Sequence, residues 1–140
     1  MTGQVKSSNI IDLELVEQYK TTADHYLAKA AQLWNKSEIR KASEMLWGAI
    51  AQYLKALAAC KGQAISTHRK FYPFVRQLAK ERKNPYLRKE FVELGLLHNN
   101  FYDEEIPPED FGTYYHRTKA YLRQINGLVR IAAKNARLKR

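Results

Sequence analysis

Apolar residues recur at alternating steps of three and four along most of this chain, and no segment sustains the alternation of two that a half-buried strand requires. This spacing is typical of helices that each bury one face. We therefore predict an all-α fold, an antiparallel bundle of four to five helices. The bundle is expected to form one domain over residues 1–135, followed by a basic tail, 136–140, which has little to bury and is expected to be mobile.

The individual helices are delimited by their apolar rows and by residues that start or stop a helix. The segment 38–61 has the most regular row and is expected to be the central helix, with Ser37 as its N-cap and Gly62 as its C-terminal stop. The short linker before it predicts an antiparallel hairpin with the preceding helix. Pro73 requires the third helix either to begin close to Tyr72 or to be kinked there. The predicted helices span approximately residues 13–35, 38–61, 67–83, 85–100 and 109–135.

Composition narrows the class of protein further. A chain of 140 residues that is 45% hydrophobic can bury one core without cross-links. Cys60 is the single cysteine, so the monomer has no internal disulfide, and no Cys or His cluster has the spacing of a zinc site. No segment has the roughly 18 apolar residues of a membrane span, and the amino-terminal residues do not resemble a signal peptide. We expect a cytoplasmic protein without a metal, a cofactor or a membrane association.

The charge balance favours anionic partners. The chain has 24 Lys and Arg residues against 14 Asp and Glu, a net charge of +10, and part of the acidic residues are concentrated in the segment DEEIPPED. Positive charge speeds encounters with polyanions and makes phosphate contacts favourable through counterion release. A soluble basic protein with no nucleic-acid function is the alternative interpretation.

The segment LGLLHNNFYDEE carries the most informative polar residues. His98 falls on the apolar row of a predicted helix. Close to it in the sequence are three further polar residues, Asn99, Asn100 and Tyr102. A histidine in this setting can donate or accept a proton or contact a phosphate, while its neighbours can orient it or contact a base. The alternative is a core histidine that is hydrogen-bonded to a tyrosine, to Glu44 or to a backbone carbonyl.

A second polar cluster lies at the predicted start of the third helix. His68 and Arg69 are followed by Lys70, and the free N–H groups of a helix start also attract phosphate. A solvated helix start is the alternative. On the last predicted helix, tyrosines alternate with Arg117 and Arg123, a combination that can stack and neutralise single-stranded RNA but that is also common in cores and interfaces.

Three segments give the chain a resemblance to a known family. The five-helix plan resembles HEPN domains, and SEMLWGAIAQYLKALAACKG, STHRKFYPFV and LLHNNFYDEE together resemble the archaeal PaREP families, which are grouped with HEPN-like proteins. The resemblance covers residues 37–103 well and the flanking helices only by their pattern.

The HEPN resemblance implies a homodimer with a polar motif that lines a cleft between the two protomers. In catalytic members this motif is an Arg followed after four to six residues by a His, and it supports metal-independent RNA cleavage. His98 takes the position of that His, but residues 91–97 contain no Arg and the nearest one upstream is Arg88. None of the other histidines has an Arg within the seven preceding residues. Arg69, Lys41 or Lys55 could supply the positive charge only by projecting into the cleft from another helix or protomer.

We therefore expect an RNA- or nucleotide-binding HEPN-like domain that is not an enzyme. The expected ligand-binding residues are His98, Asn99, Asn100, Tyr102, Lys41, Lys55, His68 and Arg69, and His98 is the single candidate catalytic residue. The resemblance also implies a role in a prokaryotic toxin–antitoxin, defence or stress system. Two alternatives stay open: an adaptor bundle that pairs with a nucleotidyltransferase-like protein, and a metal-independent ribonuclease.

Overall fold

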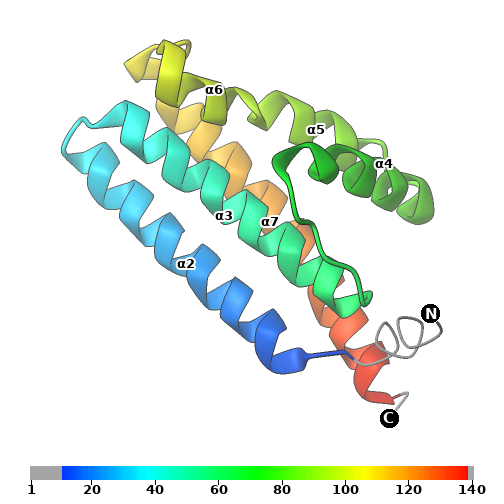
Figure 1. The fold of residues 1–140 in the computed structure, drawn as a ribbon. Helices are drawn as coiled ribbons and strands as arrows, with labels where there is room; N and C mark the ends of the chain where they lie inside the picture. Colours follow the sequence, from blue (N-terminus) through cyan, green and yellow to red (C-terminus); the bar gives the residue numbers. More distant parts are fainter. Residues whose placement is uncertain (1–10, 139–140) are drawn as a thin grey trace.

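Helix α3 occupies the middle of the computed structural model, which describes residues 11–138. It contacts α2 on one side and both α6 and α7 on the other (Figure 1). No strand occurs within residues 11–138, and the all-α prediction is confirmed. The helices are α2 (Leu13–Asn35), α3 (Ile39–Cys60), η1 (His68–Lys70), α4 (Phe71–Arg82), α5 (Tyr86–Leu94), α6 (Leu96–Asp103), η2 (Pro108–Asp110) and α7 (Phe111–Leu138).

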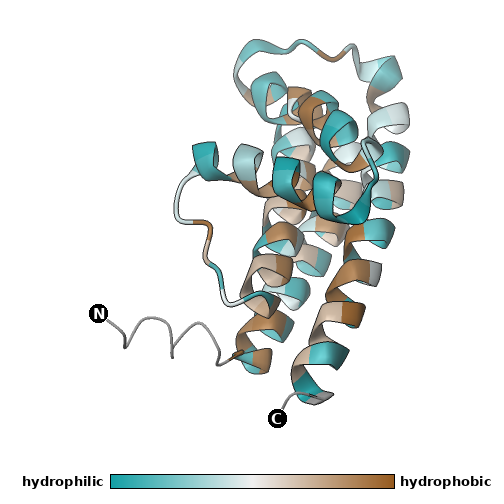
Figure 2. Ribbon diagram, turned by 90° about the vertical axis from the view of Figure 1, so that its right-hand side faces the viewer, coloured by the Kyte–Doolittle hydropathy of each residue, from teal (hydrophilic) through white to brown (hydrophobic). Residues whose placement is uncertain are grey.

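In the α2–α3 hairpin, a tyrosine ring of α2 packs directly against the backbone of α3. A Cβ atom on Gly48 of α3 would lie 2.9 Å from the Tyr26 ring of α2, so only glycine allows this approach. On the same pair of helices, the Tyr53 hydroxyl donates a hydrogen bond of 2.8 Å to Asp24. The predicted row of α3 is buried along most of its length, and hydrophobic and hydrophilic residues alternate along the helices in Figure 2. The predicted central helix and antiparallel hairpin are confirmed.

Each of the two helices in this hairpin is followed by a residue with positive φ. At the end of α2, Ser37 has φ 61°, the Ser37 N–H donates to the Trp34 carbonyl at 2.9 Å, and the Glu38 N–H donates to the Leu33 carbonyl at 2.9 Å. This pair of bonds is the Schellman motif, which ends a helix. The prediction of Ser37 as the N-cap of α3 is therefore wrong. The predicted stop at Gly62 is confirmed, because Gly62 has φ 70° and the same pair of bonds follows α3.

The chain returns through α4, α5 and α6 to the end of the bundle where α3 began (Figure 1). Pro73 lies in the first turn of α4, where its missing N–H is tolerated, and a short 3-10 turn precedes the helix. The predicted helix 85–100 is divided at Gly95, which separates α5 from α6. Helix α6, which follows this division, is in contact with α3.

Helix α7 runs in the same direction as α3, because the Trp34 ring meets Phe111 at one end and the Cys60 thiol reaches the Val129 carbonyl near the other. Arg117 ties α7 to α5 through ion pairs with Glu90 and Glu93. The helix continues to Leu138, so residues 136–138 of the predicted tail are helical because the hydrogen-bonded ladder extends beyond the last buried turn. Residues 139–140 of that tail, and residues 1–10 of the predicted domain, lie outside the described part of the chain.

The positive φ angles of Ser37 and Gly62 predict opposite effects of two substitutions on the free energy of unfolding. A left-handed backbone costs about 1 kcal/mol more for a residue with a Cβ than for glycine. Ser37→Gly is therefore expected to raise the free energy of unfolding by about 0.5–1 kcal/mol, and Gly62→Ala to lower it by about 1 kcal/mol. Urea denaturation followed by circular dichroism measures both. If Ser37→Gly lowered the free energy of unfolding instead, the interactions of the serine side chain would contribute more to stability than is gained by removing strain from the left-handed backbone.

Candidate functional site

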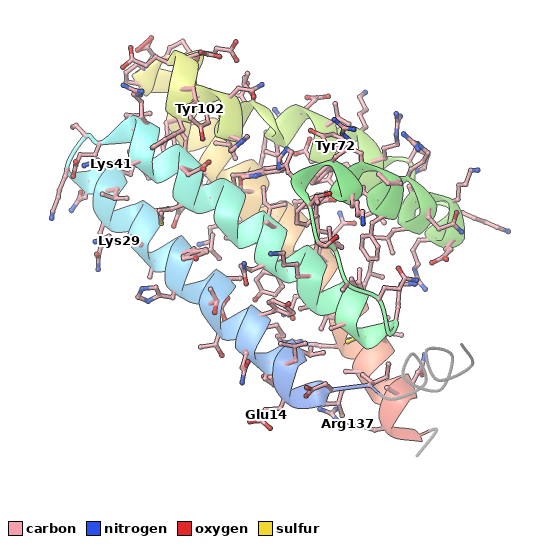
Figure 3. The ribbon with its side chains drawn as sticks, in the orientation of Figure 1. Glu14, Lys29, Lys41, Tyr72, Tyr102 and Arg137 are labelled. Atoms are coloured by element: carbon pink, nitrogen blue, oxygen red, sulfur yellow. The ribbon has the colours of Figure 1, made fainter. Side chains whose placement is uncertain are left out.

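Two imidazole rings that are far apart in the sequence meet at the surface of the bundle. The centroids of the His68 and His98 rings are 5.0 Å apart with an interplanar angle of 30°. His68 comes from η1 and His98 from α6, and the Trp47 ring of α3 lies 5.4 Å from the first and 5.9 Å from the second. The row of rings is extended by Tyr72, 6.0 Å from His68, and by Tyr102, 5.5 Å from His98, both labelled in Figure 3.

A carboxylate holds one of the two imidazoles. His98 Nδ1 is 2.9 Å from Glu44 Oε1, and each side chain is 29% exposed. When Nδ1 donates to the carboxylate, Nε2 is left as the acceptor, the arrangement by which a carboxylate orients a histidine for proton transfer or hydrogen bonding. The expected Glu44 partner is present, yet the ring is not enclosed in the core. His98 is therefore both structurally held and accessible.

The two rings line a surface pocket of about 360 Å³, which we call the two-histidine pocket. Its polar lining consists of His68, Tyr72, Glu93, His98, Asn99 and Tyr114. Among residues 11–138, no Lys or Arg side chain is part of the lining. The carboxylate in the lining, Glu93, is 2.7 Å from Arg117 Nη2, which also pairs with Glu90, so these three side chains together carry one net negative charge. Binding in this pocket would rely on ring stacking and on hydrogen bonds more than on fixed positive charge.

The two imidazoles differ in their electrostatic surroundings. Partial burial lowers the pKa of His68 below its ordinary value, and the neighbouring His98 lowers it further, while the negative charge of Glu44 opposes both effects. A lowered pKa favours the neutral ring near neutral pH. His68 is therefore suited to accept a proton or a hydrogen bond from a ligand.

The polar residues predicted beside His98 separate into two groups. Asn99 lines the two-histidine pocket, and Tyr102 is 63% exposed next to the His98 ring. Asn100 is 1% exposed and bonds inward: its amide donates to Ser43 Oγ at 3.0 Å, and its carbonyl accepts from the Ile106 N–H. Asn100 therefore joins α6 to α3 and holds the loop that follows α6. Its side chain is buried and does not line the two-histidine pocket.

The three cations predicted around His98 do not line the two-histidine pocket. Lys41 is 3.1 Å from Glu38 near the turn between α2 and α3 (Figure 3). Lys55 lies eight residues beyond Trp47 on α3, roughly 12 Å along the helix axis. Arg69 follows His68 in η1 and is exposed. Of the predicted binding residues, the structure thus brings His68, His98, Asn99 and Tyr102 together.

Sequence reasoning missed three residues of the site. The sequence suggests Glu44 only as a structural partner of His98, and it does not single out Trp47 or Tyr72. A signal was present in α3, because Glu44 and Trp47 are spaced i, i+3 and so share a face of a helix that is otherwise mostly apolar. The sequence contained no comparable indication that His68 would meet His98.

The described residues contain neither a candidate metal cluster nor a candidate membrane span. Within residues 11–138, no group of three or more His, Cys, Asp or Glu side chains is placed to hold a metal ion. Among the helices of this part of the chain, none combines the length and apolarity needed to cross a membrane.

Comparison with known proteins identifies a family. The family model described as the archaeal PaREP1/PaREP8 family matches residues 18–122. No match was found among curated proteins or among solved structures. The matched span reaches from α2 into α7 and contains both histidines of the pocket.

The surroundings of His68 predict opposite effects of two substitutions. His98→Gln removes a neighbouring positive charge and is expected to raise the pKa of His68. Glu44→Gln removes an attracting negative charge and is expected to lower it further. Proton NMR titration of the ring signals measures both, with His25→Gln on the exposed side of α2 as the control. Movement of the pKa in one direction in both variants would refute this account of the site.

Proposed function

The chain belongs to the archaeal PaREP1/PaREP8 family, and we propose that it is a HEPN-like domain that binds RNA or a nucleotide in the two-histidine pocket without cleaving it. The observation that carries this proposal is the contact between His68 and His98 beside an open pocket, with His98 held by Glu44. Rings that are fixed in place at a surface provide stacking surface with little loss of conformational freedom.

The chemistry of the lining is suited to a nucleobase. Tyr72 and Tyr114 supply aromatic surface, and Asn99 supplies both a donor and an acceptor that can pair with a base edge. Stacking of one base on an aromatic side chain contributes about 1–3 kcal/mol to binding. The exposed ring of Tyr102 extends this surface beyond the pocket.

The proposal excludes cleavage because no Lys or Arg among residues 11–138 lines the pocket, and Arg117, which lies beside Tyr114 and Glu93 of the lining, is engaged by Glu90 and Glu93. An Arg at the motif position would stabilise the charge that develops on the scissile phosphate. Here residues 91–97 contain no Arg, and neither Lys nor Arg lines the pocket.

A metal-independent ribonuclease is the second candidate, and the paired imidazoles favour it. One imidazole can take the proton of a ribose hydroxyl while the other donates a proton to the leaving oxygen, and Glu44 would orient the second. The same geometry therefore serves binding or proton transfer, and a cleavage assay separates the two.

The biological setting is part of the same proposal and rests on the HEPN resemblance. It assigns the domain to a prokaryotic toxin–antitoxin, defence or stress system, with RNA as the ligand. The rival from another class is an adaptor bundle that docks a nucleotidyltransferase-like protein, with the charge of +10 serving solubility or an acidic partner.

Substitutions in the pocket test the binding proposal. His68→Ala and His98→Gln are each expected to weaken binding of a labelled oligo(U) of about 12 nucleotides by about 10-fold, since stacking and a hydrogen bond are lost. Fluorescence anisotropy measures the affinity, and far-ultraviolet circular dichroism checks that the helices remain. His25→Ala, which removes an exposed imidazole from α2, is the matched control.

Three results would decide against this proposal. Equal loss in the His25→Ala variant would show that the histidines act only through general charge. Absence of oligo(U) binding by the unaltered chain at low salt would favour the adaptor. Accumulation of shortened RNA in the unaltered chain, abolished by His98→Gln, would establish the ribonuclease instead.

The HEPN resemblance also predicts a homodimer, and a measurement of mass in solution tests this prediction. One chain has a mass of 16.3 kDa, and sedimentation equilibrium at micromolar concentration is expected to give twice that value. Tyr102, which is large and exposed beside the pocket, is the residue we expect to lie at the protomer interface. A mass of one chain throughout the concentration range would remove the cleft between protomers from the proposal.

A further inference from the structure

A strongly basic groove lies between α4 and α5, next to the two-histidine pocket. It has a volume of about 830 Å³, and its charged lining includes five cations: Arg76, Lys80, Lys83, Arg88 and Lys89. The two helices are joined by residues 83–85 and lie side by side (Figure 1). We call this feature the α4–α5 groove.

Three cations come from α4 and its end. Arg76 and Lys80 are spaced i, i+4 and share one side of α4, and Lys83 follows as the C-cap with a left-handed backbone, φ 51°. Arg88 and Lys89 add two charges from α5. Positive charge therefore lines the groove from both helices.

This charge is not compensated by the protein itself. Among residues 11–138, none of the five cations forms an ion pair within 4.0 Å. The one acidic residue in the described lining of the groove is Glu93, which pairs with Arg117 at 2.7 Å, so five cations face a single carboxylate there. Desolvating five like charges is favourable only when an anion replaces the water, so the groove is suited to a polyanion.

The α4–α5 groove and the two-histidine pocket form one continuous surface. Val92 and Glu93 line both of them. The pocket has rings but no Lys or Arg in its lining, and the groove has cations but no aromatic ring. Proteins that bind single-stranded nucleic acid combine these two elements, a positive channel for the backbone and aromatic rings for the bases.

We propose that the α4–α5 groove binds the sugar–phosphate backbone of a single RNA strand, one nucleotide of which enters the two-histidine pocket. This inference rests on the proposed function and narrows its ligand from RNA or a nucleotide to a strand of several nucleotides. An anionic membrane is the rival polyanion. It is disfavoured because membrane-bound helices need a broad apolar face, whereas Val92 is the one large apolar side chain in the groove that is exposed.

The test uses two triple variants with the same spacing and the same loss of charge. The groove variant is Arg76→Gln, Lys80→Gln and Lys83→Gln. The control variant is Arg130→Gln, Lys134→Gln and Arg137→Gln, an i, i+4, i+7 row of exposed cations near the end of α7. Figure 3 shows Arg137 at the end of the bundle and away from Tyr72. Binding of labelled oligo(U) of about 12 nucleotides is measured at several salt concentrations.

The groove variant is expected to bind oligo(U) at least about 10-fold more weakly than the control variant. Each phosphate contact contributes about −0.7 to the slope of log affinity against log salt for a single strand, so losing three contacts should make the slope shallower by about 2. Binding of AMP, which has a single phosphate and depends on the pocket, is expected to change less than 3-fold.

The outcomes separate the groove from the pocket. Equal affinity and equal slope in the two triple variants, with binding still lost in His98→Gln, would overturn the groove while the pocket stands. Failure of the unaltered chain to bind oligo(U) at low salt would overturn both. A groove-dependent retention on vesicles of phosphatidylserine and phosphatidylcholine, without oligo(U) binding, would assign the groove to a membrane surface and refute the RNA strand.

Discussion

The burial of α3 along nearly its whole length is the constraint on which the rest of the structure depends. This helix contacts α2, α6 and α7, and Gly48 leaves room for the Tyr26 ring of α2 to pack against its backbone. A helix packed on several sides has little freedom to rotate or shift. The side chains of α3 are therefore held in defined directions, among them the partly exposed Glu44 and the buried Trp47, which both contact His98.

The candidate site lies between the tightly packed helix α3 and the exposed turn that carries His68. Glu44 fixes the His98 imidazole, and Trp47 supplies a ring beside both histidines. His68 arrives from a short exposed turn, which follows the Gly62 stop and the buried side chain of Ile65. In such a pocket, the exposed turn lets a ligand enter, and the side chains held by α3 orient the ligand.

Cations and aromatic rings line two neighbouring parts of this surface. Rings line the two-histidine pocket, five cations line the α4–α5 groove, and part of the acidic residues lie in segment 103–110. Among the described residues, no Lys or Arg lines the pocket, although the net charge of the protein is +10. Arg117 is the basic residue paired with the Glu93 of the pocket lining, and its ion pairs with Glu90 and Glu93 occupy its guanidinium. A basic composition therefore does not by itself place positive charge at a histidine.

The sequence alone determined the helical class, the central position of α3, the stop at Gly62 and the unusual polarity around His98, because periodicity and helix ends depend on residues close together in the chain. Only the tertiary structure decided which polar residues meet. Whether Asn100 points inward while Asn99 reaches the pocket depends on the rotation of α6 after the break at Gly95. The contact of His68 with His98, 30 residues apart, depends on the path of a loop and on packing against α3, and neither is a local property of the chain.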